Sequence, residues 1–203
     1  MNGYRLFFLH EVIEELGESK TKELLSSFSS PLNPDVEYFL KHRAIEFSRQ
    51  KIAPTTLVYA SYKNKWVLCG YFAIATKMFT VTKKCVGTNT FKRLKKFGTY
   101  NPEYQCCEIP APLIAQLSKN FNNEYNTLIT GDELLKLACD EVQMAQRVIG
   151  GKIVYLECED KPQLKDFYRR NGFKEFAKRN LEKADRDKLS GEYLVQMLKY
   201  FDE

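Results

Sequence analysis

The sequence predicts an α/β fold of the α+β kind, with a mixed, mostly antiparallel central sheet of six to seven strands flanked by helices. In the first half, the strands Thr56–Tyr62 and Trp66–Phe79 are separated only by a tight turn, which indicates an antiparallel hairpin. In the second half, strands alternate with helices, which indicates that part of the sheet is parallel. The length of 203 residues and the hydrophobic share of 44% fit a single domain spanning 1–203 with a sizeable core.

The N-terminal third is predicted to be mainly helical. One short strand and two short helices come first: Tyr4–Leu9, Glu11–Leu16 and Ser19–Ser27. Asn33 and Pro34 then form a helix start, because Asn is a good N-cap and Pro is tolerated at the first helical position. We expect that helix to run unbroken to about Gln50.

The second half has clear boundary signals. Thr130 and Glu133 are spaced as a capping box, and the helix that they open is predicted to end at Ile149 before two glycines. Pro110 and Pro112 precede the apolar strand Leu113–Leu117, and Pro is tolerated at the start of a strand rather than inside its ladder. The later predicted elements are the strand Ile153–Cys158, the helix Pro162–Arg170, and the strands Phe173–Phe176 and Glu192–Tyr200.

The net charge of +5 comes from one segment. Thr80–Pro102 contains six basic residues and no acidic one, so the rest of the chain sums to −1. The basic residues are Lys83, Lys84, Lys92, Arg93, Lys95 and Lys96. We assign 80–107 as a basic insertion before the fourth strand, with Thr90–Phe97 as two helical turns. It is either a solvated surface or, with Phe91, Phe97 and Tyr100 interleaved among the cations, a surface for RNA or another polyanion.

Several classes of protein are disfavoured. The longest uncharged apolar-rich run, Trp66–Ala75, is ten residues long, about half of what a bilayer requires. The apolar residues Leu6–Leu9 are too few for a secretory signal, so we expect a cytosolic protein that does not bind membranes. The six cysteines are scattered without a CxxC motif, and His10 and His42 have no partner at ligand spacing. We therefore expect reduced thiols and no metal site.

The segment from Gly150 to Phe173 carries a family resemblance. A strand ending in acidic residues, a short helix with Phe167-Tyr168 near its end, and Asn171-Gly172-Phe173 leading into a strand resemble the C-terminal half of the GNAT superfamily of N-acetyltransferases. Leu113–Lys119 is similar to the fourth strand of that family, and Ile129–Leu135 to the start of its CoA-binding helix. The hairpin that ends in Gly70-Tyr71-Phe72 is similar to its second and third strands. The resemblance covers about 33–79 and 108–200 and points to members from bacteria or mobile elements.

The resemblance implies an acetyl-CoA-dependent enzyme that transfers an acetyl group directly to a primary amine of a small molecule or macromolecule. It assigns acetyl-CoA binding to the backbone of Leu117, Ser118 and Lys119 and to Ile129, Thr130, Gly131, Asp132, Glu133 and Phe167. Backbone N–H groups at a strand end stabilise a developing oxyanion, and a helix N-terminus attracts a pyrophosphate. Tyr168 is the implied general acid for the leaving thiolate. The alternative is that Tyr168 is an aromatic core residue at a helix–strand junction.

The general base is less well defined. Glu157 and Glu159 alternate along one strand and point to the same face, so either can take a proton from an ammonium, directly or through water. Glu157 is our candidate, and Glu108 is a third carboxylate of similar standing. Each of these carboxylates is alternatively a surface residue. Cys158 lies on the opposite, apolar face and is predicted to be a buried thiol.

The phosphate loop departs from the family pattern (Q/R)xxGx(G/A). Here the matching residues begin at Asn126 and end at Gly131, with Ile129 where a glycine is expected. Because glycines let the backbone approach a phosphate closely, this predicts a different loop path, weaker CoA binding or lost activity. The alternatives are therefore a catalytically weakened GNAT-fold binding protein, or a toxin-like acetyltransferase that reaches aminoacyl-tRNA through the basic insertion. A homodimer also stays open.

Overall fold

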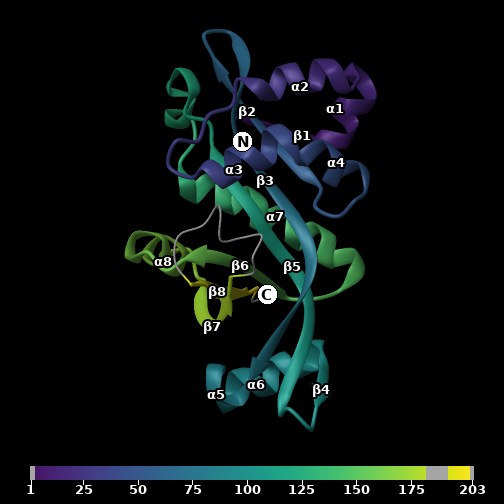
Figure 1. Ribbon diagram of the computed structural model, residues 1–203, viewed down its shortest axis with the longest axis vertical. Coiled ribbons are helices and arrows are strands. Elements are labelled where there is room, and N and C mark those ends of the chain that lie inside the picture. The colour runs from purple at the N-terminus through teal and green to yellow at the C-terminus, as the bar shows by residue number, and fades with distance from the viewer. Residues whose placement is uncertain (1–2, 182–191, 202–203) are drawn as a thin grey trace. The chain divides into compact units, whose positions relative to one another are not determined.

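The computed structural model describes residues 3–181 and 192–201. The chain forms two compact units: unit 1 comprises Met1–Ala75 and Ile114–Asp140, and unit 2 comprises Thr76–Leu113 and Glu141–Glu203. Three elements, β3 (Lys65–Thr82), β5 (Cys106–Lys119) and α7 (Gly131–Ile149), contribute to both units (Figure 1).

The mixed α/β architecture is confirmed, and the described residues form eight strands where six to seven were predicted. The hydrogen-bonded order is β1-β2-β3-β5-β6-β8-β7, and β4 pairs with β5 off this path. The other strands are β1 (Tyr4–Phe8), β2 (Thr55–Tyr62), β4 (Thr99–Asn101), β6 (Ile153–Glu159), β7 (Lys174–Asn180) and β8 (Tyr193–Tyr200). The other helices are α1 (Leu9–Leu16), α2 (Glu18–Ser26), α3 (Pro34–His42), α4 (Ala44–Arg49), α5 (Lys83–Val86), α6 (Thr88–Leu94) and α8 (Pro162–Arg170), with 3-10 segments η1 (Lys95–Phe97) and η2 (Asn122–Thr127).

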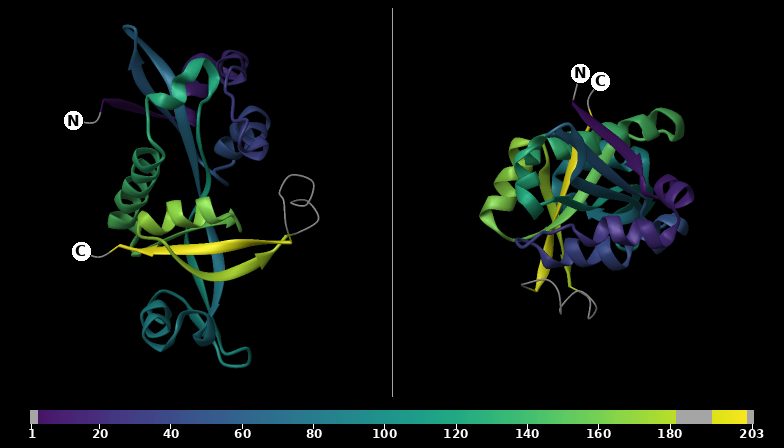
Figure 2. Two further views of the ribbon diagram at one scale, coloured as in Figure 1. Left: turned by 90° about the vertical axis from the view of Figure 1, so that its left-hand side faces the viewer. Right: turned by 90° about the horizontal axis from the view of Figure 1, so that it is seen from above.

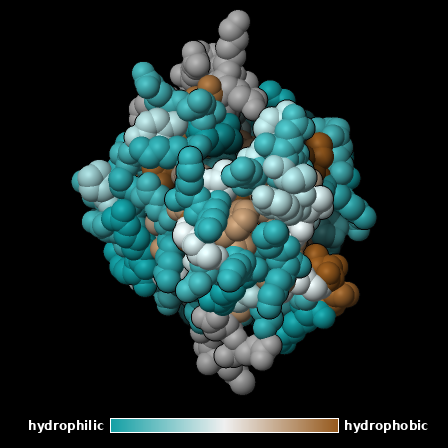
Figure 3. Space-filling model, turned by 90° about the horizontal axis from the view of Figure 1, so that it is seen from below, coloured by the Kyte–Doolittle hydropathy of each residue, from teal (hydrophilic) through white to brown (hydrophobic). Residues whose placement is uncertain are grey.

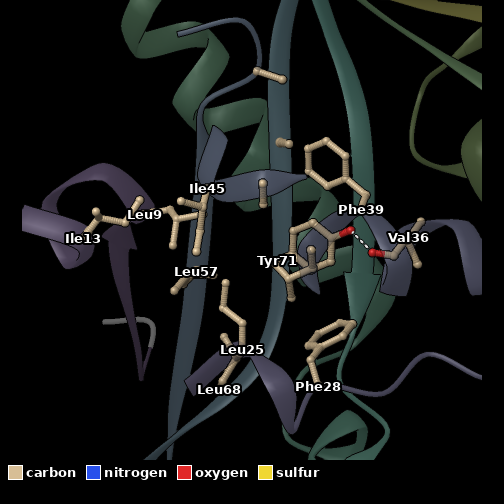
Figure 4. Close-up of a cluster of buried hydrophobic side chains, with 14 of the residues drawn as sticks. Leu9, Ile13, Leu25, Phe28, Val36, Phe39, Ile45, Leu57, Leu68 and Tyr71 are labelled. Carbon is tan, nitrogen blue, oxygen red and sulfur yellow. Dashed lines mark hydrogen bonds between the residues drawn. The ribbon is translucent and has the colours of Figure 1, made fainter. Parts of the chain in front are cut away.

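Unit 1 is organised around an antiparallel sheet. β1 pairs with β2 from Tyr4↔Ala60 to Phe8↔Thr56, and β2 pairs with β3 across the predicted hairpin. Helices α1 to α4 pack their apolar residues against these strands in one cluster (Figure 4). Inside this cluster the Tyr71 hydroxyl donates to the Val36 carbonyl at 2.5 Å, which satisfies the only polar group of a fully buried ring.

Unit 2 contains an antiparallel group in which β8 lies between β6 and β7. Figure 2 shows β8 in yellow alongside β7, with α8 next to them. The core of this unit contains the rings of Phe79, Tyr155 and Phe176, with centroids 4.9 to 5.0 Å from Phe79. Phe91 and Leu94 of α6 belong to the same cluster, so the insertion is packed into this core.

Three expectations about the elements need correction. The helix predicted from Asn33 to Gln50 breaks at Arg43, whose φ of −122° and ψ of −31° separate α3 from α4. β5 begins at Cys106 rather than Leu113 and passes through both prolines. Pro110 and Pro112 lie two residues apart, so the positions without an N–H group face the same adjacent strand. The edge of β5 that faces the opposite adjacent strand keeps all its N–H donors. The insertion contains two short α-helices, the 3-10 segment η1 and the strand β4, more than the two helical turns predicted.

The surface of the described residues is largely polar. The face drawn in Figure 3 is mostly hydrophilic, with hydrophobic residues in small separate patches. All six cysteines are free thiols, and only Cys85 is exposed. No helix within the described ranges is long and apolar enough to cross a membrane.

Candidate functional site

The N-terminus of α7 carries the predicted capping box. The Thr130 backbone N–H donates to Glu133 Oε2 at 2.8 Å, and Thr130 Oγ1 accepts from the Glu133 N–H at 3.1 Å. The donated Thr130 backbone bond stabilises the carboxylate, so the pKa of Glu133 is lowered. The helix start is therefore fixed by its own side chains, and the first turn also carries the carboxylate of Asp132.

Three side chains hold the loop before α7 in place. One of them is Ile129, which stands where the family pattern has a glycine. Ile129 is buried at 1% exposure, so its side chain anchors the loop in unit 1. Lys119 Nζ donates to the Asn126 carbonyl at 3.0 Å, and the Tyr4 hydroxyl donates to the Leu128 carbonyl at 3.2 Å. Burial, with a hydrogen bond to Glu133, raises the pKa of Tyr4 to about 12, so the hydroxyl stays protonated as a donor. Ile129 therefore fixes this loop by burying its side chain, which a glycine at the same position could not do.

The end of β5 lies close to β3 and α7 within unit 1. Ser118 is buried and its hydroxyl donates to Ser30 Oγ at 2.9 Å, while Leu117 and Lys119 are half-buried. A Cβ added to Gly70 would lie 3.0 Å from the Ser118 carbonyl oxygen and 3.2 Å from a methyl group of Leu134. Gly70 therefore allows the close approach of these three elements.

Sequence reasoning missed Asn120, which directly follows β5. Its Oδ1 accepts from the Ser29 and Asn122 backbone N–H groups, both at 3.0 Å. Its Nδ2 donates to the Leu68 carbonyl at 2.9 Å, and its backbone N–H donates to the Cys69 carbonyl at 2.8 Å. In the sequence this residue is one of several in a polar loop, and no local pattern distinguishes it from the others.

Tyr168 lies in the last turn of α8, in unit 2. Its ring makes edge contacts with Phe167 and Phe173, at centroid distances of 4.9 and 6.0 Å. Its carbonyl accepts from the Asn171 and Phe173 N–H groups at 3.1 and 3.0 Å, which fixes the turn into β7. Burial raises the pKa of Tyr168 well above its usual value, with the Cys158 thiol adding to the effect. The half-buried phenol therefore stays protonated at neutral pH, as a general acid must be before it gives up its proton.

The candidate bases differ in their surroundings. Glu157 accepts from Arg179 Nε and from Gln196 Nε2, both at 2.8 Å, so each of its oxygens already has a partner. Glu159 forms an ion pair with Lys161 at 2.6 Å, and Glu108 is exposed. The pairing with Arg179 indicates that Glu157 has a structural role. Its role as general base stays a separate prediction.

Cys158 is the buried thiol that the strand pattern predicted. Burial raises its pKa to about 11, and the nearby carboxylates of Asp160 and Glu175 act in the same direction. Such a thiol is almost entirely protonated at neutral pH and therefore a poor nucleophile.

Three aromatic residues of the insertion have structural partners, and Phe97 contacts Tyr200 edge-on at 6.0 Å. Phe91 is buried and contacts Tyr100 edge-on at 6.2 Å, and Lys95 Nζ lies 3.9 Å from the centroid of the Tyr100 ring. The guanidinium of Arg93 lies 4.0 Å from the centroid of the Tyr200 ring in β8. These contacts hold the insertion together. The other cations, all exposed, are Lys83, Lys84, Lys92 and Lys96.

The structure places the predicted site residues in two groups. Leu117–Lys119 and Ile129–Glu133 belong to unit 1, and Glu157, Phe167 and Tyr168 belong to unit 2. Across residues 3–181 and 192–201, no three His, Cys, Asp or Glu residues are grouped to hold a metal ion.

No protein-family model and no curated protein matches the chain. Solved structures do match it over nearly its whole length. AtaT complexed with acetyl-methionyl-tRNAfMet has a TM-score of 0.61 at 14% identity, covering 95% of this chain and 93% of that one. The chain has the GNAT fold.

Two further GNAT-fold structures agree. A tyrosine-to-phenylalanine mutant of KacT has a TM-score of 0.60 at 13% identity, covering 96% of this chain and 94% of that one. A tyrosine-to-phenylalanine mutant of the AtaT toxin, bound to the C-terminus of the antitoxin AtaR and to acetyl-CoA, has a TM-score of 0.56 at 14% identity, covering 98% of this chain and 94% of that one. The fold predicted from the motifs is therefore confirmed.

Proposed function

We propose that this protein is an acetyl-CoA-dependent N-acetyltransferase that transfers the acetyl group directly to a primary amine. The observation that carries the proposal is Tyr168, a half-buried and protonated phenol at the α8–β7 turn of a GNAT fold. We propose further that residues 1–203 act as one acetyltransferase-like domain, with 80–107 as a basic insertion.

Residues of each unit are assigned a role in this reaction. The backbone N–H groups of Leu117, Ser118 and Lys119 stabilise the carbonyl oxygen as the amine attacks the thioester carbon. As the C–N bond forms and the C–S bond breaks, Tyr168 gives its proton to the departing thiolate, with Phe167 packed beside it. The start of α7, Ile129–Glu133, holds the pyrophosphate.

The proton that the amine loses is assigned to Glu157. Each of its oxygens accepts one hydrogen bond in the structure, and a carboxylate oxygen has a second lone pair for a substrate or water. Glu157→Gln separates this role from a purely structural one. If the variant loses turnover while its free energy of unfolding is unchanged, Glu157 acts as the base. If the variant loses turnover only to the extent that it is unfolded, Glu157 has a structural role.

For the acceptor we propose the amine of an aminoacyl-tRNA. The insertion presents Lys83, Lys84, Lys92 and Lys96 to solvent, and exposed cations suit a phosphate backbone. The matched AtaT structure is a complex with acetyl-methionyl-tRNA, which is the product that such a reaction yields.

A second candidate function is a GNAT-fold binding protein with weakened catalysis. The observation that favours it is the start of α7, where Ile129 replaces a glycine and the carboxylates of Asp132 and Glu133 occupy the first turn. Like charges in that turn oppose the binding of a pyrophosphate.

Calorimetric titration with acetyl-CoA distinguishes the two functions. The enzyme binds acetyl-CoA, and Tyr168→Phe slows transfer to aminoacyl-tRNA while the Kd for acetyl-CoA changes little. The matched control is Tyr62→Phe, which removes a hydroxyl at the end of β2 and keeps the ring contact with Tyr125. Absence of binding at millimolar acetyl-CoA rejects the enzyme, and unchanged turnover in Tyr168→Phe removes Tyr168 from its role.

A further inference from the structure

The buried side chain of Asn120 forms three hydrogen bonds within unit 1. It is 1% exposed, directly follows β5, and contacts three separate segments of the chain. Its amide oxygen accepts from Ser29, between α2 and α3, and from Asn122 at the start of η2. Its amide nitrogen donates to Leu68 in β3.

Backbone bonds reinforce this junction on both sides. The Asn120 N–H donates to the Cys69 carbonyl at 2.8 Å, and the Phe121 N–H donates to the Ser29 carbonyl at 2.8 Å. The Ser118 hydroxyl donates to Ser30 on the same loop. The residues on either side of Asn120 are therefore fastened to β3 and to the segment that leads into α3.

The side chain uses both lone pairs of its oxygen and one of its two amide hydrogens. A smaller side chain would leave the Ser29 and Asn122 N–H groups without this partner, and a buried unpaired donor is costly. The segment would then shift toward water or another acceptor. Leu117, Ser118 and Lys119 immediately precede Asn120, so such a shift moves them as well.

We propose that Asn120 is a positioning residue, which fixes the backbone N–H groups of Leu117–Lys119 where they bind the acetyl carbonyl. This inference rests on the proposed function and deepens it. It also links those groups to the Ser29–Ser30 segment, so that the two sides of the β5 end move together. A misplacement of about 1 Å at a reacting centre reduces a rate on the order of 10²-fold.

The test compares Asn120→Ala and Asn120→Asp with the control Asn122→Ala, whose side chain forms no hydrogen bond with the residues that the structure describes. Asn120→Ala is expected to lower kcat on the order of 10²-fold while the Kd for acetyl-CoA changes little, because the start of α7 is untouched. The control retains the kcat of the unaltered chain.

Asn120→Asp tests the mechanism by pH. The introduced carboxylate accepts from Ser29 and Asn122 but cannot donate to the Leu68 carbonyl until it is protonated. The ratio of its kcat to that of the unaltered chain should therefore rise as the pH falls. A role in stability alone predicts variants whose kcat per folded molecule equals that of the control. If Asn120→Ala does not fold, the pH profile of Asn120→Asp decides the question.

The outcomes separate this inference from the proposed function. If the unaltered chain neither binds acetyl-CoA nor transfers its acetyl group, the proposed function is rejected and the inference with it. If the unaltered chain is active and the Asn120 variants keep the kcat of the control at every pH, the inference alone is overturned. Hydrogen exchange of the 117–119 amides, faster in Asn120→Ala than in the control, is the expected local signature.

Discussion

Replacing Gly70 by alanine tests the close packing of β3, β5 and α7 in unit 1. The added Cβ would lie 3.0 Å from the Ser118 carbonyl oxygen and 3.2 and 3.3 Å from the two terminal methyl carbons of Leu134. Neither neighbour yields easily, because one is strand backbone and the other is a leucine at 1% exposure. Overpacking of this kind typically costs about 1–3 kcal/mol.

The loss of a glycine partly offsets that cost. Alanine restricts the unfolded chain and so stabilises a protein by about 0.4–1 kcal/mol where the backbone permits it. The net change in the free energy of unfolding is therefore a loss of roughly 0–2.6 kcal/mol. At about 2–4 °C per kcal/mol for a chain of this size, the midpoint of thermal unfolding falls by up to roughly 10 °C.

Urea unfolding followed by circular dichroism measures the loss directly. The matched control is Gly3→Ala, because the added Cβ there meets nothing within 4 Å and the φ of Gly3 lies outside the left-handed region. The difference between the two variants isolates the clash. If Gly70→Ala unfolds at the same urea concentration as Gly3→Ala or a higher one, the argument that Gly70 is required for close packing is refuted.

Three further predictions concern the capping box, a surface carboxylate and the insertion. Thr130→Ala should lower the free energy of unfolding by about 0.5–2 kcal/mol and Thr130→Ser should restore it, because only a hydroxyl accepts from the Glu133 N–H; equal urea midpoints for the two variants would contradict this. Lys165 and the Tyr193 hydroxyl lower the pKa of Asp160 from 3.8 to about 2, so its stabilising contribution is complete above pH 3.8 and is lost as the pH falls through 2. Asp160→Asn should therefore unfold more easily than the unaltered chain at pH 7 and equally easily below pH 2, and a difference that persists in acid would exclude this linkage. Neutralising the exposed lysines of the insertion should reduce the slope of log K against log salt for tRNA by about 0.7 for each phosphate that no longer has a lysine partner, and an unchanged slope would remove the insertion from RNA binding. The substituted lysines are Lys83, Lys84, Lys92 and Lys96, and the control replaces Lys20, Lys22, Lys63 and Lys65.

Elements whose boundaries are set by neighbouring residues were predictable. The helix Pro162–Arg170 has the bounds that its proline and the following Asn171-Gly172 indicated. The capping box of Thr130 and Glu133 forms with the expected pair of bonds, since its partners are only three residues apart. Local signals of this kind depend little on the rest of the fold.

Features that depend on distant segments were not predictable. The apolar spacing around Arg43 is the same for one helix as for two, so it does not reveal the break. The role of Asn120 depends on Ser29 and Leu68, which lie 91 and 52 residues away. Among the candidate site residues, the role of Tyr168 as general acid stays a prediction. The sequence did not show that Glu157 is paired with Arg179, because that pairing follows from the registers of β6 and β7 with β8.

The insertion carries part of the core of unit 2, and this governs how it can be altered. Phe91 and Leu94 pack beside Phe79 and Ile109. Excising the insertion to test for nucleic-acid binding would remove Phe91 and Leu94 and expose Phe79 and Ile109 to water. A loss of binding in such a variant would therefore not report on the charge of the insertion. The same packing makes this segment a poor choice for grafting onto another acetyltransferase scaffold. Its conformation depends on the contacts of Phe91 and Leu94 with residues of β3 and β5. Its exposed lysines, by contrast, can be exchanged one at a time on an intact support.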